Sequence, residues 1–190
     1  MTVTKRKADV PIYQIKVTLE GSKPPIWRRL LVRSDITLGE LHHIIQAAMG
    51  WWDYHLHQFI VGETYYGVPN PDYLDYTEMH DESQVTLSQI VPGERSRFRY
   101  EYDFGDGWLH QILVEKILPP EPGQHYPACV KGRRACPPED VGGIWGYEGF
   151  LEAIQNPEHP EREDYLEWIG GEFDPVASDL DKVNAALLTL

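Results

Sequence analysis

Polar and apolar side chains alternate along several short segments of the chain, and a period of two predicts β-strands. The segment 12–20 alternates without interruption. Pro24 and Pro25 end this first strand because proline donates no hydrogen bond to a sheet. A second strand follows over 26–32 and has Arg28 on its apolar face. A buried charge there needs a carboxylate or several hydrogen bonds, but we expect a strand-end arginine that reaches water.

The next segment has the three-to-four-residue spacing of a helix. Thr37 and Glu40 form a capping box, and Gly50 is placed to end the helix, so we predict a helix over 37–49. Its apolar stripe includes His42, whereas His43 points away from the stripe. We favour a core-edge histidine bonded to the backbone as the interpretation of His42.

A strand is then predicted over 55–61, with His55 and His57 on one face. Residues 62–84 are rich in Gly, Pro, Asp and Tyr, and predict turns and a long irregular loop. A short helical turn is expected near 87–90.

Two runs of alternating aromatic and polar residues flank a Gly-Asp-Gly tripeptide and predict a β-hairpin. A two-residue turn sets Asp103 opposite His110. A three-residue loop instead pairs Phe104 with Trp108 and Tyr102 with His110, which matches apolar side chains along the whole face. We favour the second register, in which Asp103 points away from His110.

The rest of the chain predicts a proline-rich structured loop over 119–145, then helices near 147–155, 160–169 and from Ser178 onward. The fold class that follows is a single α+β domain, with an antiparallel β-sheet packed against α-helices. We predict a flexible basic tail over 1–10 and the domain over 11–190.

Charge and composition narrow the function. The net charge of the 190 residues is −13, and 13 of the 30 acidic residues lie within 139–190, against two basic ones. Broad electrostatic binding of nucleic acid is therefore disfavoured. No apolar run approaches the roughly 20 residues that span a bilayer, and no signal segment opens the chain, so we expect a cytoplasmic protein without a membrane segment.

Three kinds of chemistry are compatible with the polar residues. His55 and His57, with Asp103, are candidate ligands of a divalent metal, although nothing in the sequence requires a cofactor. Cys129 and Cys136 are seven residues apart, wider than common zinc knuckles, and we favour unreactive thiols.

The third kind is acid–base catalysis by Glu139 and Asp140, which follow Pro-Pro. Carboxylates at such a place are ordinary turn and cap residues, and that interpretation is favoured.

The chain resembles the plasmid pRiA4b ORF-3-like family over roughly residues 11–188. The motifs that carry the resemblance are Pro25-Ile26-Trp27-Arg28-Arg29, Leu41-His42 through Gly50-Trp51, His55-Leu56-His57-Gln58-Phe59, Tyr102-Asp103-Phe104-Gly105-Asp106, Ala135-Cys136-Pro137-Pro138-Glu139-Asp140, Gly142-Gly143 with Gly146-Tyr147, and Phe173-Asp174-Pro175. The resemblance implies one α+β domain in an uncharacterised family, some of whose members carry labels linking them to mobile elements. Val141 stands where many relatives have a third cysteine, which argues against a thiolate metal cluster.

Two functions are compared, and whether the protein is an enzyme stays open. The first is a non-enzymatic module whose polar-aromatic cleft binds a small molecule or a protein partner. The candidate cleft residues are Trp27, Arg28, His42, His55, His57, Asp103, Asp106, Trp108, His110, Glu139 and Asp140.

The alternative is a metal-dependent hydrolase. There His55 and His57 bind the metal and Asp103 or Asp106 completes the site, while His110 or Glu139 acts as the base. A third interpretation makes the same motifs fold determinants, with glycines for turns and tryptophans for the core.

Overall fold

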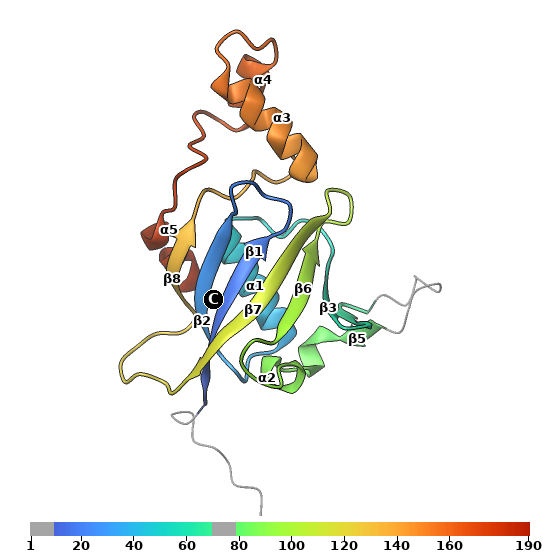
Figure 1. Ribbon diagram of the computed structural model, residues 1–190, viewed down its shortest axis with the longest axis vertical. Coiled ribbons are helices and arrows are strands. Elements are labelled where there is room, and N and C mark those ends of the chain that lie inside the picture. Colours follow the sequence, from blue (N-terminus) through green and yellow to red (C-terminus); the bar gives the residue numbers. More distant parts are fainter. Residues whose placement is uncertain (1–9, 70–78) are drawn as a thin grey trace, which may run out of the picture.

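The fold is known from a computed structural model that describes residues 10–69 and 79–190 (Figure 1). Nine of the ten residues of the predicted basic tail lie outside these ranges. The elements follow in the order β1 (Ile12–Leu19), β2 (Trp27–Arg33), α1 (Leu38–Met49), β3 (His57–Val61), β4 (Thr64–Gly67), β5 (Met79–Asp81), the 3-10 helix η2 (Glu82–Gln84), α2 (Leu87–Ile90), β6 (Arg97–Tyr102), β7 (Trp108–Leu118), β8 (Ala128–Arg133), α3 (Gly143–Gln155), α4 (Arg162–Trp168) and α5 (Leu180–Leu187).

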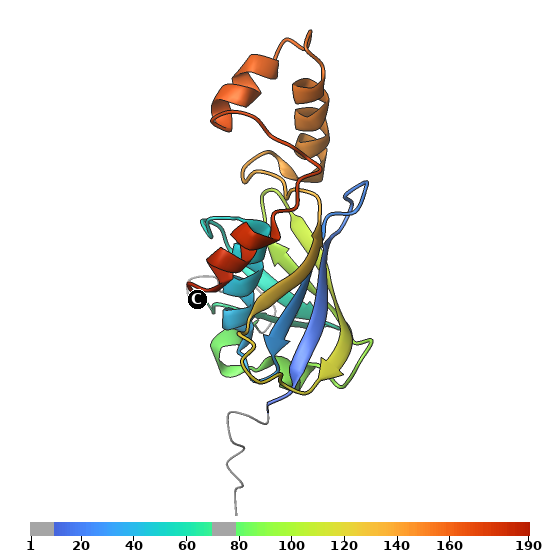
Figure 2. The ribbon, with the colours of Figure 1, turned by 90° about the vertical axis from the view of Figure 1, so that its left-hand side faces the viewer.

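The described residues form one eight-stranded sheet, in the order β5-β4-β3-β6-β7-β1-β2-β8. All neighbouring pairs are antiparallel except β4 with β5. Helices α1 and α5 cover one face of this sheet (Figure 2), and the opposite face carries no helix in the described part of the chain. The predicted α+β class is confirmed.

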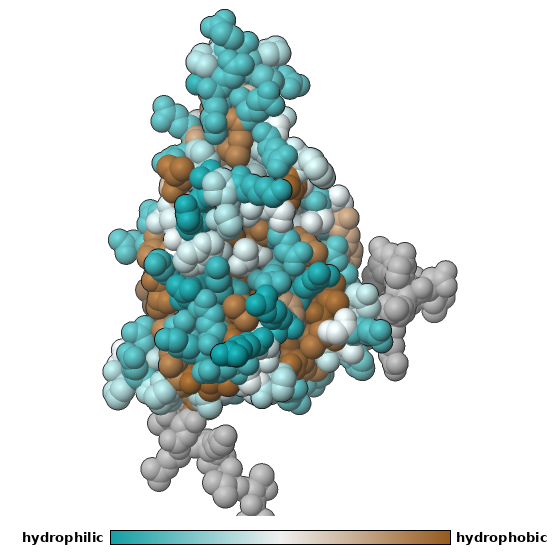
Figure 3. Space-filling model, in the orientation of Figure 1, coloured by the Kyte–Doolittle hydropathy of each residue, from teal (hydrophilic) through white to brown (hydrophobic). Residues whose placement is uncertain are grey.

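The core lies between the sheet and α1. Alternate residues of the central strands are buried against the apolar side of this helix, as the period-two pattern predicts. In β1 these are Ile15, Val17 and Leu19, each at most 1% exposed. Polar residues occupy the other positions, and Figure 3 shows mainly hydrophilic side chains on the open side.

The ends of α1 also agree with the sequence. The hydroxyl of Thr37 accepts a hydrogen bond from the amide of Glu40 (3.1 Å), and the Glu40 carboxylate accepts one from the amide of Thr37 (2.7 Å). Gly50 follows in the left-handed conformation with φ of 82°, which glycine adopts without steric cost. This well-defined end determines where the next connection leaves the helix.

The register predicted for the hairpin is wrong. Tyr102 pairs with Trp108, and Tyr100 pairs with His110, so five residues rather than three connect β6 and β7. Asp103 begins this turn with φ of 55°, and its carbonyl accepts a hydrogen bond from the amide of Gly107 (2.6 Å). The apolar match along one face survives, because both registers keep the same side chains on the core side.

Other boundaries also differ from the prediction. Within 62–84, the described residues form β4, β5 and a 3-10 turn, and residues 70–78 of the predicted loop lie outside the described ranges. The predicted loop 119–145 contains the edge strand β8, and α3 already begins at Gly143.

Helices α3 and α4 form a separate lobe beyond one end of the sheet (Figures 1 and 2). Its centre is aromatic: the ring of Phe150 lies 5.4 Å from that of Tyr165 and 5.2 Å from that of Phe173. The lobe contains many of the acidic residues that the sequence gathers after position 139.

Helix α5 packs against α1 and against β8 at the edge of the sheet. The side-chain oxygen of Asn184 accepts a hydrogen bond from the amide of Cys129 (2.8 Å), and its nitrogen donates to the Cys129 carbonyl (2.9 Å). A helix side chain therefore occupies hydrogen-bonding positions of the edge strand.

Among the described residues, no helix has the length and apolar character needed to cross a bilayer.

Candidate functional site at the loop end of the sheet

Three connections meet at the end of the sheet beneath α3 (Figure 1): the α1–β3 connection (50–56), the β6–β7 turn (103–107) and the β8–α3 connection (134–142). We call this region the loop end. The amide of Asp103 donates a hydrogen bond to the carbonyl of Leu56 (2.8 Å), which joins the first connection to the second.

The third connection is bonded to both of the others. The amide of Gly142 donates to Asp106 Oδ2 (3.1 Å), and the amide of Trp52 donates to Glu139 Oε2 (2.7 Å). Glu139 and Asp106 therefore act first as cross-links between connections that are distant in sequence.

Glycines allow the third connection to approach so closely. A Cβ atom at Gly143 would overlap the carbonyl oxygen of Asp106, and one at Gly146 would overlap the carbonyl oxygen of Val141. Gly143 also has φ of 68°, in the region that favours glycine. Gly143 thus sets the position of α3 relative to the β6–β7 turn, and Gly146 sets it relative to the preceding connection.

The α1–β3 connection exposes several large apolar side chains. Trp52, Tyr54 and Leu56 are 74%, 75% and 59% exposed. Trp51 is buried, and its indole nitrogen donates to the carbonyl of Pro137 (2.9 Å). Trp51 thus holds the connection in place, while Trp52, Tyr54 and Leu56 project their apolar side chains toward solvent.

Tyr102 is the central hydrogen-bonding residue beneath this connection. Its hydroxyl donates to Glu139 Oε1 (2.6 Å) and accepts from the amide of Tyr54 (3.0 Å). Burial, followed by the bond to the Glu139 carboxylate, raises the pKa of Tyr102 well above its usual range. The hydroxyl therefore stays protonated and keeps its role as a donor.

His55 lies between two carboxylates from the other two connections. Its Nε2 atom is 2.9 Å from Asp140 Oδ1 and 3.7 Å from Asp103 Oδ2. The described residues thus bring together three of the candidate cleft residues, from three separate segments.

His42 is buried and is held by side chains rather than by the backbone, contrary to our expectation. The amide nitrogen of Gln46 donates to the Tyr100 hydroxyl (2.8 Å), which leaves that hydroxyl to donate to His42 Nδ1 (2.7 Å). Nε2 then carries the proton and donates to Asp53 Oδ1 (2.8 Å).

Burial, reinforced by the neighbouring His57 and His43, lowers the pKa of His42 to about 2. Although Asp53 lies at ion-pairing distance, this histidine is neutral, because its ring is almost completely shielded from water.

His57 does not share a strand face with His55, because β3 begins only at His57. The His57 ring stacks on His42 at a centroid distance of 3.4 Å, and its Nε2 contacts Glu82 Oε2 at 2.8 Å. The expected pair of neighbouring histidine ligands is therefore absent among the described residues.

Arg28 does not reach water. It is 4% exposed and donates to the carbonyls of Ala48 (3.1 Å), Trp27 (3.0 Å) and Arg133 (3.3 Å). Its remaining nitrogen lies 3.1 Å from Cys136 Sγ. Several hydrogen bonds, rather than a carboxylate, satisfy this buried charge.

The two cysteines are free thiols. Burial raises the pKa of Cys136 to about 11, against the opposing effect of Arg28, and also raises the pKa of Cys129. The favoured interpretation of unreactive thiols agrees with these directions.

Three further candidate residues lie outside any cleft. Trp108 and His110 are fully buried, because their strand positions point into the core. Trp27 lies on the open face of the sheet, where Lys16 and Arg29 approach its ring at 4.8 and 5.2 Å. The predicted cleft of eleven residues is therefore not formed as a unit, and its core-side members act in packing.

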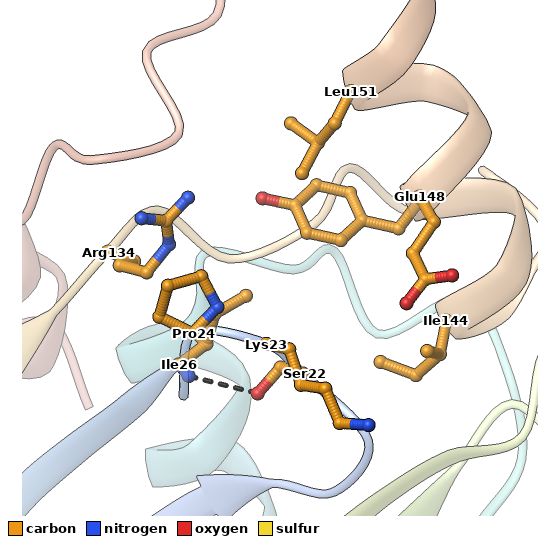
Figure 4. A pocket seen from close by; sticks show the side chains of 9 residues that line it. Ser22, Lys23, Pro24, Ile26, Arg134, Ile144, Glu148 and Leu151 are labelled. Atoms are coloured by element: carbon orange, nitrogen blue, oxygen red, sulfur yellow. Dashed lines mark hydrogen bonds between the residues drawn. The ribbon is translucent and has the colours of Figure 1, made fainter.

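A small pocket lies next to the loop end, between the β1–β2 loop and α3 (Figure 4). In this view Ile144, Glu148 and Leu151 of α3 face Lys23 and Pro24 of the loop. None of the candidate cleft residues lines it. The pocket marks where α3 meets the β1–β2 loop, and Arg134 is the residue of the loop end that contributes to its lining.

Sequence reasoning missed several residues of the loop end. Trp52, Tyr54, Leu56 and Phe104 are exposed apolar side chains that had not been proposed for the site. Alternation over 51–56 was the available signal, but it lies in an irregular connection where period-two patterns are not usually sought.

The fold and the loop end define a class: single α+β domains with an open sheet face and a polar-aromatic surface where three hydrogen-bonded connections meet. The chain belongs to the plasmid pRiA4b ORF-3-like protein family, whose model matches residues 11–182.

Two relatives extend this assignment. The uncharacterised protein y4hQ of Sinorhizobium fredii (strain NBRC 101917 / NGR234) is 38% identical over 178 residues, which cover 93% of this chain and 90% of the relative. The crystal structure of MM3350 from Methanosarcina mazei Go1, described as a protein of unknown function, is similar with a TM-score of 0.84 and 39% identity. The match covers 93% of this chain and 98% of that one.

Proposed function

We propose that the protein is a non-enzymatic binding module whose loop end receives an apolar segment of a partner protein. The observation that carries this proposal is the outward display of Trp52, Tyr54 and Leu56, which are all more than half exposed. Large apolar side chains gathered at one place on a surface are typical of interaction sites.

The residue types suit this role. Burying one such side chain contributes about 1.5–3 kcal/mol, and tryptophan and tyrosine are enriched among the residues that dominate binding energy. Phe104 adds a further half-exposed ring on the β6–β7 turn.

The connection is also held rigid. The backbone amides of Trp52 and Tyr54 are both bonded, to Glu139 and to Tyr102 respectively. A surface that is ordered before binding loses less entropy when the partner arrives. The side chains project toward solvent rather than lining an enclosed pocket, which favours a protein segment over a small molecule.

The hydrolase alternative has less support. It requires His55 and His57 in one site, but His57 contacts Glu82 and His42 instead. The two proposed bases are also occupied, since His110 is fully buried and Glu139 bonds Tyr102 and Trp52.

We further propose that the module acts in the cytoplasm. The two free thiols, one of them buried in the core, are compatible with a reducing compartment.

The test uses the double variant Trp52→Ser/Tyr54→Ser as bait beside the wild-type protein in extracts of the source organism. A protein retained only by the wild type would then be purified and titrated. We expect the double variant to weaken its dissociation constant by about 100-fold or more, since two anchor side chains are lost.

Trp168→Ser is the matched control, because Trp168 is a half-exposed tryptophan on α4, away from the three connections. It should bind as the wild type does. Equal affinities for the wild type and the double variant, or the absence of any partner selective for the wild type, would contradict the proposal.

A further inference from the structure

A nitrogen and two carboxylate oxygens converge where the three connections of the loop end meet. One ring nitrogen of His55 and one carboxylate oxygen each of Asp103 and Asp140 all lie within 4.8 Å of one another. Each comes from a different connection, so the cluster exists only in the folded chain.

The hydrogen-bonding capacity of this cluster is not used. His55 Nε2 is shielded from solvent yet has no hydrogen-bond partner among the described residues, because the close approach of Asp140 does not have hydrogen-bond geometry. A shielded ring nitrogen without a partner is uncommon in folded proteins.

Asp103 also has an oxygen that receives no hydrogen bond from any described residue. The residue is 8% exposed, and its Oδ1 atom accepts hydrogen bonds from the amides of Gly105 (2.9 Å) and Asp106 (3.4 Å). No described residue donates a hydrogen bond to Oδ2, the oxygen on the side of His55. One oxygen therefore fixes the carboxylate, and the other is left for a ligand.

The charge of the cluster is also unbalanced. In the described ranges, neither Asp103 nor Asp140 pairs with a lysine or an arginine. Two carboxylates close to one imidazole have a charge that a divalent cation would neutralise.

The spacing fits such an ion. Donors at about 2.0–2.2 Å from a metal are separated by roughly 3–3.5 Å. The contacts of His55 with the two carboxylates, 2.9 and 3.7 Å, bracket that range. One imidazole and two carboxylates suit a first-row transition metal better than Ca²⁺ or Mg²⁺, which prefer oxygen donors alone.

A second group, His42, His43 and Asp53, also lies within 4.8 Å but is chemically different. His42 already uses both ring nitrogens, toward Tyr100 and toward Asp53. An ion there would have to break a buried network, so this group provides a control.

We propose that His55, Asp103 and Asp140 bind one first-row divalent metal ion, Zn²⁺ or Mn²⁺, which ties the three connections together. Three protein ligands leave further coordination positions to water or to a donor from a bound molecule. The proposal is independent of partner binding, since the exposed side chains of Trp52 and Tyr54 are not ligands.

The test is calorimetric titration of tag-free, chelator-treated protein with zinc sulfate and, separately, manganese chloride. We expect one ion per chain for at least one of the two metals. His55→Ala and Asp140→Asn should each weaken its dissociation constant by about tenfold or more, since each removes one of three ligands. Asp140 is exposed, so its substitution leaves the fold intact, and circular dichroism of each variant checks this.

His43→Ala is the matched control, because it removes an exposed histidine of the second group. It should bind the metal as the wild type does. The proposal is overturned if neither metal binds the wild type, or if affinity is unchanged in both His55→Ala and Asp140→Asn. Loss of binding in His43→Ala alone would also overturn it, since the site would then lie in the second group.

Discussion

The hydroxyl group of Tyr102 links two connections through a single oxygen atom. It accepts from the amide of Tyr54 and donates to Glu139, which in turn accepts from the amide of Trp52. The orientation of the exposed apolar surface thus depends on one buried side chain beneath it.

Tyr102→Phe is therefore expected to lower the free energy of unfolding by about 1–2 kcal/mol, because a shielded amide and a carboxylate lose their partner. Hydrogen exchange at the amides of residues 52 and 54 should become faster. Urea denaturation and exchange mass spectrometry measure the two effects.

Tyr54→Phe is the control for this prediction. Its own hydroxyl makes no hydrogen bond with any described residue, and the ring is largely exposed. Unfolding free energy and exchange should match the wild type. Similar exchange in Tyr102→Phe and the wild type would show that the connection is held by other contacts.

His110 makes stability depend on pH in a known direction. Burial lowers its pKa to about 4, from an unfolded value near 6.5. The native ring stays neutral between these values, whereas the unfolded chain takes up a proton. Stability is therefore complete above pH 6.5 and falls as the pH drops toward 4, by about 2 kcal/mol between pH 7 and pH 5.

His110→Phe should remove about this much of the pH dependence, which thermal unfolding at pH 7, 6 and 5 would measure. His42 acts in the same direction and remains in the variant, so some dependence persists. His125→Gln, at an exposed position, should leave the wild-type profile unchanged. If the stability of His110→Phe fell with pH as steeply as that of the wild type, the pH dependence could not be attributed to His110.

At the scale of elements, the position of α3 depends on two places where its glycines lie directly against the backbone of neighbouring segments. Gly143 and Gly146 leave no space for a side chain against the carbonyl oxygens of Asp106 and Val141. Gly149, one turn further along the same helix, has open space around it.

Gly146→Ala is expected to destabilise the protein by about 3 kcal/mol or more, because a backbone segment must move to admit the methyl group. Gly149→Ala in the same helix should instead stabilise it by about 0.5–1 kcal/mol, since alanine favours helix. Thermal denaturation of the two variants distinguishes these cases. Equal effects of the two substitutions would mean that the close approach does not restrict α3.

Elements with a complete local pattern could be predicted from the sequence, and those that depend on distant contacts could not. Strand β1 and helix α1 follow from alternation and from the Thr37–Glu40 capping box. The predicted hairpin register was wrong, because the five-residue turn depends on the left-handed conformation of Asp103 and on the hydrogen bond that the amide of Gly142 donates to the Asp106 carboxylate. Neither feature has a signature in the local pattern.

The candidate site could be predicted only in part, because it too depends on contacts between distant segments. His55, Asp103 and Asp140 were singled out by residue type, but their convergence requires three connections to meet. Arg28, Trp108 and His110 were assigned to a cleft although their strand positions face the core. Alternation already placed Arg28 on the apolar face, and the expectation that its side chain reaches water was wrong.

At the scale of the whole molecule, the α3–α4 lobe has its own aromatic centre beyond the end of the sheet. Such an appended unit is expected to open at a lower free energy than the central strands. Amides of α3 and α4 should therefore exchange with solvent before those of β1 and β7.

Phe150→Ala tests this separation, since Phe150 is fully buried within the lobe. Hydrogen exchange should accelerate across α3 and α4, because the substitution lowers the free energy of opening of the lobe by about 3–5 kcal/mol. Strands β1 and β7 should keep their protection at low denaturant concentration. Ile15→Ala, in the sheet core, should affect every element. Uniform acceleration in both variants would show a single cooperative unit.

An open sheet has two edges at which a strand of another molecule can add, and such addition begins aggregation. At β8 the amide and carbonyl of Cys129 are already bonded to Asn184 of α5. The opposite edge strand, β5, is only three residues long. Asn184 thus occupies the positions on Cys129 to which a strand of a second chain would bond, so α5 blocks this part of the β8 edge against strand addition.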